Sequence, residues 1–528
     1  MNKLFLILFS IILLVSCKSE PAITNFLQKK IDSGIIEGVI SEDGLVEKYL
    51  GIPYAKPPIG ELRWKAPQKV TPWEGVLKTQ EYGNIAMQYK FAPWVNFDET
   101  RLSEDCLYLN VWKPINTGDQ KLPVLVNIHG GGLLVGEGSE LRMEGTSMAN
   151  KGMIVVTLNY RLNIFGFFAH PELSEESPNG ASGNYGYLDQ QFALQWVKNN
   201  IAVFGGDPNK ITIAGESAGS WSVLSLMASP LSKNMITGAI GSSGGVIPLQ
   251  PLEEAAQNGK LAAENAGFAA MSDLRNATAE EIITFYKNGN PSAFGPVLDN
   301  YVFTKNIPET FEAGEQAQIP LLIGWNSAEL PAEAYLRGPF YTKENFEKIT
   351  KELYPNDAEE MLKMFPHETT EEVHRSSLDL ASIRFIGLGA WKWFDLHRKN
   401  SSKPVYRYLY SKVHPPNKFH NIDMATYKAP LGARHAEEVA YSWGNLHLDK
   451  NFNFSEDDFK VSTIMQEYFS NFIKTGNPNN NELPEWPAVD ANTEVPMIMN
   501  IDTNTELIPA SLDYRFRFID NAGNPNSN

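Results

Sequence analysis

Continuous runs of apolar residues mark the strands of this chain. Five such runs are rich in β-branched and aromatic residues. They are too short for typical helices and too uniformly apolar for strands that expose one face to solvent. They are Leu122–His129, Ile154–Tyr160, Lys210–Gly215, Ile319–Gly324 and Val405–Tyr410. These runs predict parallel strands that are covered on both faces.

Helical patterns lie between these strands, notably Tyr187–Phe204 and the stretch that follows Ser217. Because strands and helices alternate, we expect an α/β fold with a large, mostly parallel central sheet and helices on both faces. Closer to the N-terminus, Ser33–Ile59 predicts short antiparallel strands, with Asp43-Gly44 as a hairpin turn between IIEGVI and LVEKYL. We therefore also expect a small N-terminal antiparallel sheet.

The first 17 residues, MNKLFLILFSIILLVSC, combine the basic Lys3 with an apolar run, Leu4–Val15. That run is too short to cross a bilayer core of about 30 Å, and it predicts a secretion signal. The LVSC ending resembles the bacterial lipobox, in which the cysteine, here Cys17, carries the lipid. An ordinary signal peptide with a chance cysteine is the alternative. We expect an exported cell-envelope lipoprotein, or otherwise a periplasmic or secreted protein, that meets membranes only through this anchor.

The rest of the chain is expected to form one catalytic domain. A length of 528 residues would suggest three or four domains at about 150 residues each. However, the alternation of strands and helices continues without an internal repeat, a low-complexity block or a clear linker. We assign residues 1–17 to the signal peptide with its lipobox, 18–520 to a single domain and 521–528 to a polar tail.

Composition narrows the class of protein. A content of 43% hydrophobic and 20% charged residues is that of an ordinary globular protein. The net charge of -17 argues against a nucleic-acid partner, because neutralising phosphates requires a basic surface. The chain has only two cysteines, Cys17 and Cys106. If Cys17 carries lipid, Cys106 has no partner and the protein folds without disulfides.

A serine between glycines lies where the Lys210–Gly215 strand gives way to a helix. The GESAG motif (215–219) fits G-x-S-x-G, and its position predicts a nucleophile elbow with a strained backbone at Ser217. A plain tight turn is the alternative. A serine hydroxyl also needs a base and donors for an oxyanion. The HGGG motif (129–132) directly follows a strand, so the N–H groups of Gly131, Gly132 and Ala218 are predicted to form an oxyanion hole.

These motifs lie in longer blocks: SEDCLYLNVWKP (103–114), HGGG, the block from GNYGYLDQQ to GESAGS (183–220) and GARHAEEVAY (432–441). In this order they resemble the type B carboxylesterases, which include cholinesterases and bacterial esterases. The resemblance covers nearly everything after the signal segment. It implies the α/β-hydrolase fold and a triad that runs serine, acid, histidine along the chain.

By this resemblance Ser217 is the nucleophile, Glu329 in IPLLIGWNSAEL is the acid and His435 in GARHAEEV is the base. The neighbours of Glu329 differ from the Asp and Gly that are common in the family, and Glu333, four residues on, is the alternative acid. His435 would accept the Ser217 proton and later protonate the leaving alcohol.

Other polar residues of these blocks are expected to support the site. Glu216, Asp189 and Glu438 are interpreted as ion-paired or supporting acids, because a buried carboxylate without a partner is costly. His129 is expected to hold its own loop. Many relatives bridge the cysteine of the EDCL block, but AMQ replaces the segment with the partner here, so Cys106 is predicted to be a buried free thiol.

The sequence therefore predicts a serine carboxylic ester hydrolase that acts through an acyl-enzyme on a small-molecule ester and water, with no metal and no cofactor. A catalytically silent binding or adhesion protein on the same fold is one alternative. A hydrolase of amides, thioesters or carbonates is another. Trp94, Trp221, Trp325 and Phe340 are candidates for the substrate pocket. Acyl and alcohol specificity and the oligomeric state stay open.

Overall fold

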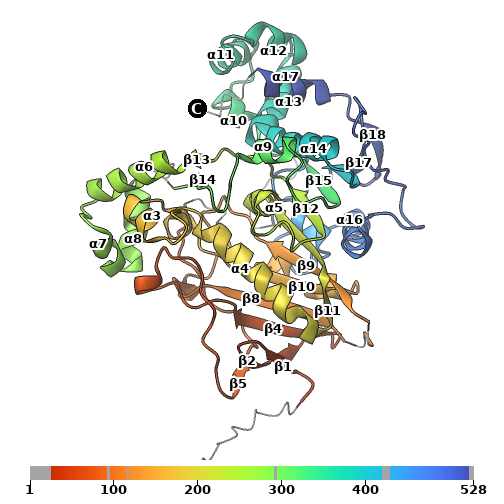
Figure 1. The fold of residues 1–528 in the computed structure, drawn as a ribbon. Helices are drawn as coiled ribbons and strands as arrows, with labels where there is room; N and C mark the ends of the chain where they lie inside the picture. The colour runs from red at the N-terminus through yellow and green to blue at the C-terminus, as the bar shows by residue number, and fades with distance from the viewer. Residues whose placement is uncertain are drawn as a thin grey trace, which may run out of the picture.

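A computed structural model describes residues 25–91, 95–115, 117–118, 120–289, 294–418 and 429–522. The predicted signal peptide with Cys17 lies outside these residues, as does most of the predicted tail. An 11-stranded sheet forms the centre of the protein (Figure 1). Its strands are β3 (Val39–Ile40), β4 (Val46–Pro53), β8 (Tyr108–Pro114), β9 (Leu122–Ile128), β10 (Ile154–Leu158), β11 (Gly206–Glu216), β12 (Gly238–Ser242), β15 (Leu321–Asn326), β16 (Val405–Tyr410), β17 (Met497–Ile501) and β18 (Glu506–Pro509).

The strand order is β18-β17-β16-β15-β12-β11-β9-β10-β8-β4-β3. All neighbours from β10 to β17 are parallel, whereas both edges are antiparallel. The five predicted strands correspond to β9, β10, β11, β15 and β16. Strand β12 was not predicted, because its sequence, GAIGS, has too few apolar residues to stand out as a buried run.

The central strands are apolar on both faces because both faces are covered. In β9, Val126 packs into the cluster with Leu224, while Leu125 points into the opposite cluster with Met465. This alternation explains the continuous apolar runs. The first face is covered by α4 (Tyr185–Asn200), α5 (Ala218–Ala228), α9 (Ile307–Glu312) and α14 (Leu388–Asn400), and the second by α1 (Thr146–Ala149), α15 (Val439–Ser442) and α16 (Glu456–Thr475).

A small separate sheet lies near the N-terminus. Strands β1 (Gln28–Ile31) and β2 (Gly34–Glu37) pair antiparallel, and β5 (Val76–Lys78) adds in parallel to β2. The predicted hairpin turn at Asp43-Gly44 is confirmed between β3 and β4, and Gly44 has a φ of +74°. That hairpin extends the edge of the large sheet, so the predicted N-terminal strands divide between the two sheets.

Helices beyond the sheet form two lobes (Figure 1). A long helical run passes without a break from α13 (Thr370–Ser382) through one π-helical turn, η6 (Ile383–Gly387), into α14. One lobe contains α6 (Leu252–Asn265), α7 (Met271–Asn276) and α8 (Ala279–Asn288), and the other contains α10 (Ala332–Leu336), α11 (Lys343–Leu353), α12 (Ala358–Met364), α13 (Thr370–Ser382), η6 (Ile383–Gly387) and α17 (Asp513–Asn521). The short elements are α2 (Asn163–Phe167), α3 (Pro171–Glu176), β6 (Ile85–Ala86), β7 (Leu102–Ser103), β13 (Gln250–Pro251) and β14 (Val297–Leu298).

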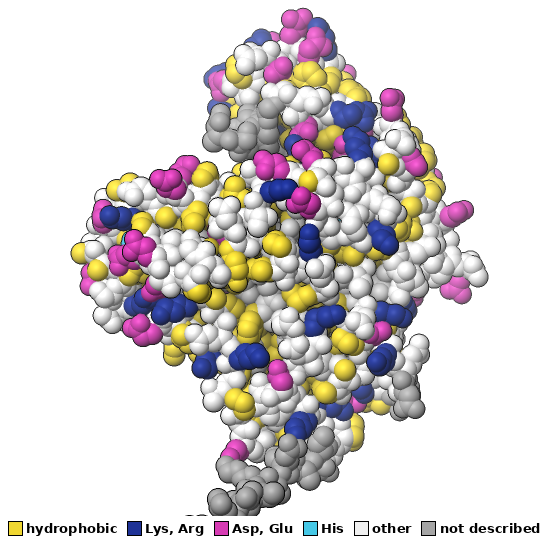
Figure 2. Space-filling model, viewed as in Figure 1, with side chains coloured by type: hydrophobic (Ala, Val, Ile, Leu, Met, Phe, Trp, Pro, Cys, Tyr) yellow, Lys and Arg dark blue, Asp and Glu magenta, His cyan; other side chains and the backbone are white. Residues whose placement is uncertain are grey.

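The face of the protein drawn in Figure 2 has no large basic patch. Figure 2 shows Lys and Arg side chains dispersed over this face, without a continuous basic stripe of the kind that tracks a nucleic-acid backbone. Within the described ranges, no helix has both the length and the apolarity needed to cross a bilayer.

Candidate active site

Ser217 lies at the turn where β11 ends and α5 begins. Its φ of +56° and ψ of −123° are far from helical values, as predicted for a strained elbow. The flanking glycines give clearance, because a Cβ on Gly215 would lie 2.3 Å from the carbonyl carbon of Gly219, and one on Gly219 would lie 2.1 Å from the oxygen of Ile128. The Ser217 N–H donates to the Ser242 carbonyl at the end of β12, at 2.9 Å.

Three predicted site residues meet at this turn. The Ser217 Oγ is 2.9 Å from His435 Nε2, and His435 Nδ1 is 2.6 Å from Glu329 Oε2. Glu329 follows β15 and is buried. Its other oxygen accepts hydrogen bonds from the Asn326 N–H and the Ser243 hydroxyl, both at 2.7 Å. The carboxylate is therefore fixed on both sides, and the imidazole is held between acid and alcohol.

The alternative acid has a different environment. Glu333 lies on α10, where its carboxylate accepts a hydrogen bond from the Tyr341 hydroxyl. The hydroxyl bond lowers the pKa of Glu333 against a smaller opposing effect of burial. Of the two candidate acids, Glu329 is the one that contacts His435.

Two further carboxylates approach the imidazole. Glu216 Oε1 lies 3.3 Å from His435 Nε2, which is an ion-pair distance without hydrogen-bond geometry. Glu438 accepts a hydrogen bond from the Asn326 side-chain amide at 2.6 Å. Burial raises the pKa of Glu216 to about 7, and burial together with the charges of Glu216 and Glu329 raises that of Glu438 to about 8. The supporting role predicted for both acids agrees with these positions, but the direct approach of Glu216 to the base was not foreseen.

The charges of the nearby carboxylates change the pKa of His435, the candidate base. Burial alone lowers the pKa of His435, but the negative charges of Glu216, Glu329 and Glu438 outweigh it and raise the pKa to about 9. A small cavity of about 30 Å³ borders Glu216, Glu438 and Ser242, which is enough room for a water molecule. The site is thus built to stabilise a positively charged imidazolium.

The glycine loop after β9 lies against the elbow. Gly131 has a φ of +98° and Gly132 a φ of +67°, values that favour glycine. A Cβ on Gly130 would lie 2.6 Å from the Glu216 carbonyl oxygen, so the two backbones are in close contact. The N–H groups of Gly131, Gly132 and Ala218 have no acceptor among the described residues. For Ala218 this follows from its place in the first turn of α5.

The remaining polar candidates are structural. Asp189 is buried and accepts hydrogen bonds from Arg161 Nε and Nη2 at 2.8 and 2.7 Å, so the predicted ion pair is confirmed. His129 stacks on Tyr160 with ring centroids 4.5 Å apart. Burial lowers the pKa of His129 to about 4, which keeps the ring neutral. Cys106 is a buried free thiol, as predicted.

The four aromatic residues that were candidates for the substrate pocket have different environments. Trp94 lies outside the described residues, and Trp325 packs on the guanidinium of Arg407, 4.4 Å from the ring centroid. Trp221 is partly buried on α5, and Phe340 is 60% exposed. The aromatic ring beside the base is instead that of Phe385, which no motif marks in the sequence. Its centroid lies 4.9 Å from that of His435.

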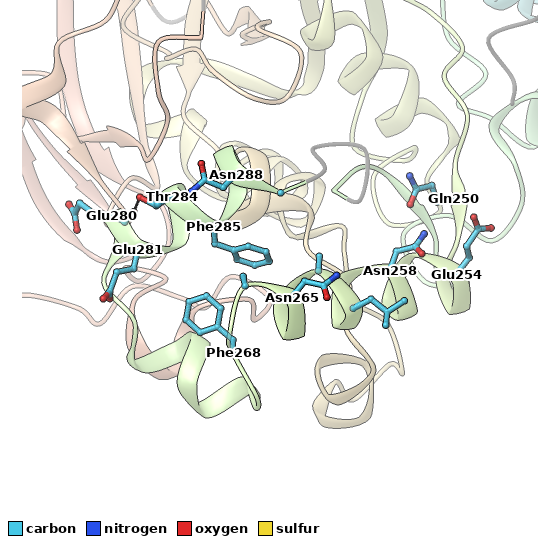
Figure 3. Close-up of a pocket in the computed structure, with 14 residues that line it drawn as sticks. Gln250, Glu254, Asn258, Asn265, Phe268, Glu280, Glu281, Thr284, Phe285 and Asn288 are labelled. Carbon is cyan, nitrogen blue, oxygen red and sulfur yellow. Dashed lines mark hydrogen bonds between the residues drawn. The ribbon is translucent and has the colours of Figure 1, made fainter.

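A large groove lies elsewhere, between α6 and α8 (Figure 3). It has a volume of about 1140 Å³, and its walls carry mainly Asn, Glu and Thr side chains over a floor with Phe268 and Phe285. No predicted site residue lines it. The groove is therefore separate from the contacts around Ser217.

The sequence of this protein is similar to those of known esterases. The carboxylesterase family model matches residues 27–517. The chain belongs to the carboxylesterase family. It is 34% identical to para-nitrobenzyl esterase of Bacillus subtilis (strain 168), over 90% of this chain and 96% of that protein. It is 33% identical to fumonisin B1 esterase of Sphingopyxis macrogoltabida, over 89% of this chain and 86% of that one.

A solved structure supports the same conclusion. PNB esterase superposes with a TM-score of 0.76 at 30% identity, covering 93% of this carboxylesterase and 99% of that chain. The predicted α/β-hydrolase fold is confirmed by this match and by the mostly parallel sheet. The protein is a carboxylic ester hydrolase.

Proposed function

We propose that this carboxylesterase works through an acyl-enzyme formed on Ser217. The observation that carries the proposal is the continuous chain of contacts from Glu329 to His435 to the Ser217 hydroxyl, at 2.6 and 2.9 Å. A neutral imidazole at this distance accepts the hydroxyl proton as the oxygen attacks the ester carbonyl. Glu329 keeps the Nδ1 proton in place, so that Nε2 is the basic nitrogen.

The tetrahedral intermediate needs donors for its negative oxygen. The N–H groups of Gly131, Gly132 and Ala218 are the proposed oxyanion hole, and their lack of protein acceptors supports that role. His435 then gives its proton to the leaving alcohol oxygen. In the second half-reaction the same base activates water, which releases the acid and restores Ser217.

Above its pKa of about 9, His435 is neutral in the free enzyme and becomes charged only while the proton is in transit. Glu329 and Glu216 both face the ring, and their charges favour the imidazolium that develops in the transition state. Stabilising a charge that is absent from the ground state lowers the barrier. Glu216 therefore acts as a second carboxylate on the base.

Ester is favoured over the other bonds that the same triad can cleave. Relatives named as a para-nitrobenzyl esterase and a fumonisin B1 esterase support it. Amides, thioesters and carbonates differ in the fit of the leaving group and stay as alternatives. A silent binding protein on this fold is not favoured, because the serine, histidine and acid are all in contact.

Export and lipid attachment at Cys17 are proposed from the sequence of residues 1–17 alone. The basic residue, the short apolar run and the terminal cysteine support a lipoprotein of the cell envelope, and a periplasmic or secreted protein is the alternative.

The test of the chemistry is hydrolysis of p-nitrophenyl butyrate by the wild type and by Ser217→Ala. We expect the variant to lose at least about a thousandfold in kcat/KM, and mass spectrometry to find the trapped acyl group on Ser217 in the wild type. Ser272→Ala, an exposed serine on α7, is the matched control and should keep full activity. Equal rates for wild type and Ser217→Ala would remove the proposal.

A further inference from the structure

The residue after the proposed base has a strained backbone. Ala436 directly follows His435, and its φ of +63° lies in the left-handed region, which residues other than glycine rarely adopt. In this region the Cβ comes too close to the following carbonyl oxygen. The conformation therefore needs contacts that hold it. If Ala436 relaxed, the main chain at His435 would turn and carry the imidazole with it.

The chain up to His435 is anchored beside β15. The His435 N–H donates to the Glu329 carbonyl at 3.2 Å. The side-chain amide of Asn326, the last residue of β15, donates to the Arg434 carbonyl at 2.6 Å. These bonds fix the residues that precede Ala436, and they leave Ala436 itself to be held by other contacts.

Arg142 supplies a hydrogen bond to Ala436. It lies on η3 (Leu141–Met143), a short 3-10 turn downstream of the glycine loop, and its Nη1 donates to the Ala436 carbonyl at 3.0 Å. The Val439 N–H approaches the same carbonyl at 3.4 Å. The bond from Arg142 is the shorter of the two, and its donor is charged, which makes such a bond stronger than one between neutral groups.

The Arg142 side chain and its main chain are themselves held. Its Nε donates a hydrogen bond to the Glu140 carboxylate. The buried side-chain amide of Asn445 donates to the carbonyls of Arg142 and Glu144 at 3.0 and 2.9 Å. The guanidinium is therefore oriented before it meets Ala436, so little side-chain entropy is lost in making that bond.

The positive charge of Arg142 also acts on Glu216. Burial raises the pKa of Glu216, and the charges of His435 and Arg142 oppose that rise. This charge effect does not depend on the backbone conformation of Ala436. A substitution at residue 436 therefore separates it from the hold on the main chain.

We propose that Arg142 is a positioning residue for the base. Its bond to the Ala436 carbonyl holds the left-handed conformation, and this keeps the His435 imidazole in line with the nucleophile. The inference rests on the proposed role of His435 in the acyl-enzyme mechanism. Because both half-reactions use this imidazole, a displaced ring lowers kcat, whereas KM changes little.

The experiment measures kcat and KM with p-nitrophenyl butyrate for the wild type, Arg142→Met and Arg142→Lys. In Arg142→Met, which loses the donor and the charge, kcat should fall about tenfold and KM should stay within about twofold. Arg142→Lys keeps a charged donor and should lose less than about threefold. Arg517→Met is the matched control with full activity expected, since Arg517 of α17 also donates to a carbonyl, that of Glu494, at 3.1 Å.

A second substitution tests the route through Ala436. Glycine adopts the left-handed conformation without a steric cost, so the hold from Arg142 matters less in an Ala436→Gly background. There, adding Arg142→Met should lower kcat less than about threefold, compared with about tenfold when residue 436 is alanine. A tenfold loss in both backgrounds is the result of a pure charge effect on Glu216, and it would overturn the inference.

Other outcomes are equally decisive. An unchanged kcat in Arg142→Met, or a loss that lies in KM instead, also overturns the positioning role. Hydrolysis that does not depend on Ser217 overturns the proposed function, whatever the Arg142 variants do. Near-UV circular dichroism checks that each variant is folded. Because 37% of the Arg142 side chain is exposed, its replacement leaves no large buried cavity, and Arg142→Gln replaces the methionine variant if that one fails to fold.

Discussion

Removing the charge of Glu216 should have a measurable effect on the proposed base. Glu216→Gln removes a negative charge 3.3 Å from His435 Nε2 while keeping the shape of the side chain. Burial opposes the charge on His435, yet the surrounding carboxylates raise its pKa to about 9, and the charge of Glu216 is the largest single charge effect among them. We expect its removal to lower the pKa of His435 by at least about one unit, which corresponds to about 1.4 kcal/mol.

The consequence for the rate depends on pH. Below the pKa of His435 the imidazole is protonated both in the free enzyme and in the transition state, so Glu216 stabilises both states equally. Above that pKa the free imidazole is neutral, and only the transition state loses the attraction. The plateau of kcat/KM at high pH should therefore fall about tenfold in Glu216→Gln. The values on the acid limb should stay close to those of the wild type.

The assay is the pH profile of kcat/KM with p-nitrophenyl butyrate for the wild type, Glu216→Gln and Glu333→Gln. Glu333 is the control because its carboxylate bonds to Tyr341 instead of His435. The midpoint of the acid limb should move down by about one pH unit in Glu216→Gln and stay in place in Glu333→Gln. An unmoved midpoint, or an equal loss of rate at every pH, would refute the reasoning.

Three other changes test the fold and the export of the protein. Glu438 has a folded-state pKa raised to about 8, mainly by burial, so folding binds its proton more tightly and the wild type loses stability as pH rises from its ordinary value of 4.5 towards 8. Glu438→Gln should therefore raise the urea midpoint at pH 8.5 and leave it nearly unchanged at pH 4; a larger gain at pH 4 would contradict this. Gly219→Ala should lower the free energy of unfolding in urea by about 1–3 kcal/mol, because a Cβ there would lie 2.1 Å from the Ile128 carbonyl oxygen. That clash exceeds the gain in helix propensity of about 1 kcal/mol. A more stable variant would show that the two backbones can move apart. Cys17→Ser should abolish lipid labelling in a bacterial host and move the enzyme from the membrane fraction to the soluble one, and labelling that persists would rule out Cys17 as the lipid site.

Local sequence determined much of this fold. Strands β9, β11 and β16 were predictable because residues buried on both faces are apolar at most positions, so their burial is visible in the sequence itself. The elbow at Ser217 was predictable for a similar reason, since the glycines that let two backbones cross lie within two positions of the serine. Strand β12 was not, because its Gly241 makes room for Trp393 of α14 and Ser220 of α5, contacts that only the packed protein defines.

The tertiary structure decided which distant residues meet at the active site. The sequence left Glu329 and Glu333 as alternative acids, and four residues of separation turn one towards His435 and the other towards Tyr341. It offered no sign that Glu216 lies at the edge of the imidazole or that Phe385 lies against its ring. A sequence motif reflects only the constraints between residues that are close together in the chain. Distances between residues that are far apart in the chain follow from strand order and helix packing, which the whole fold sets together.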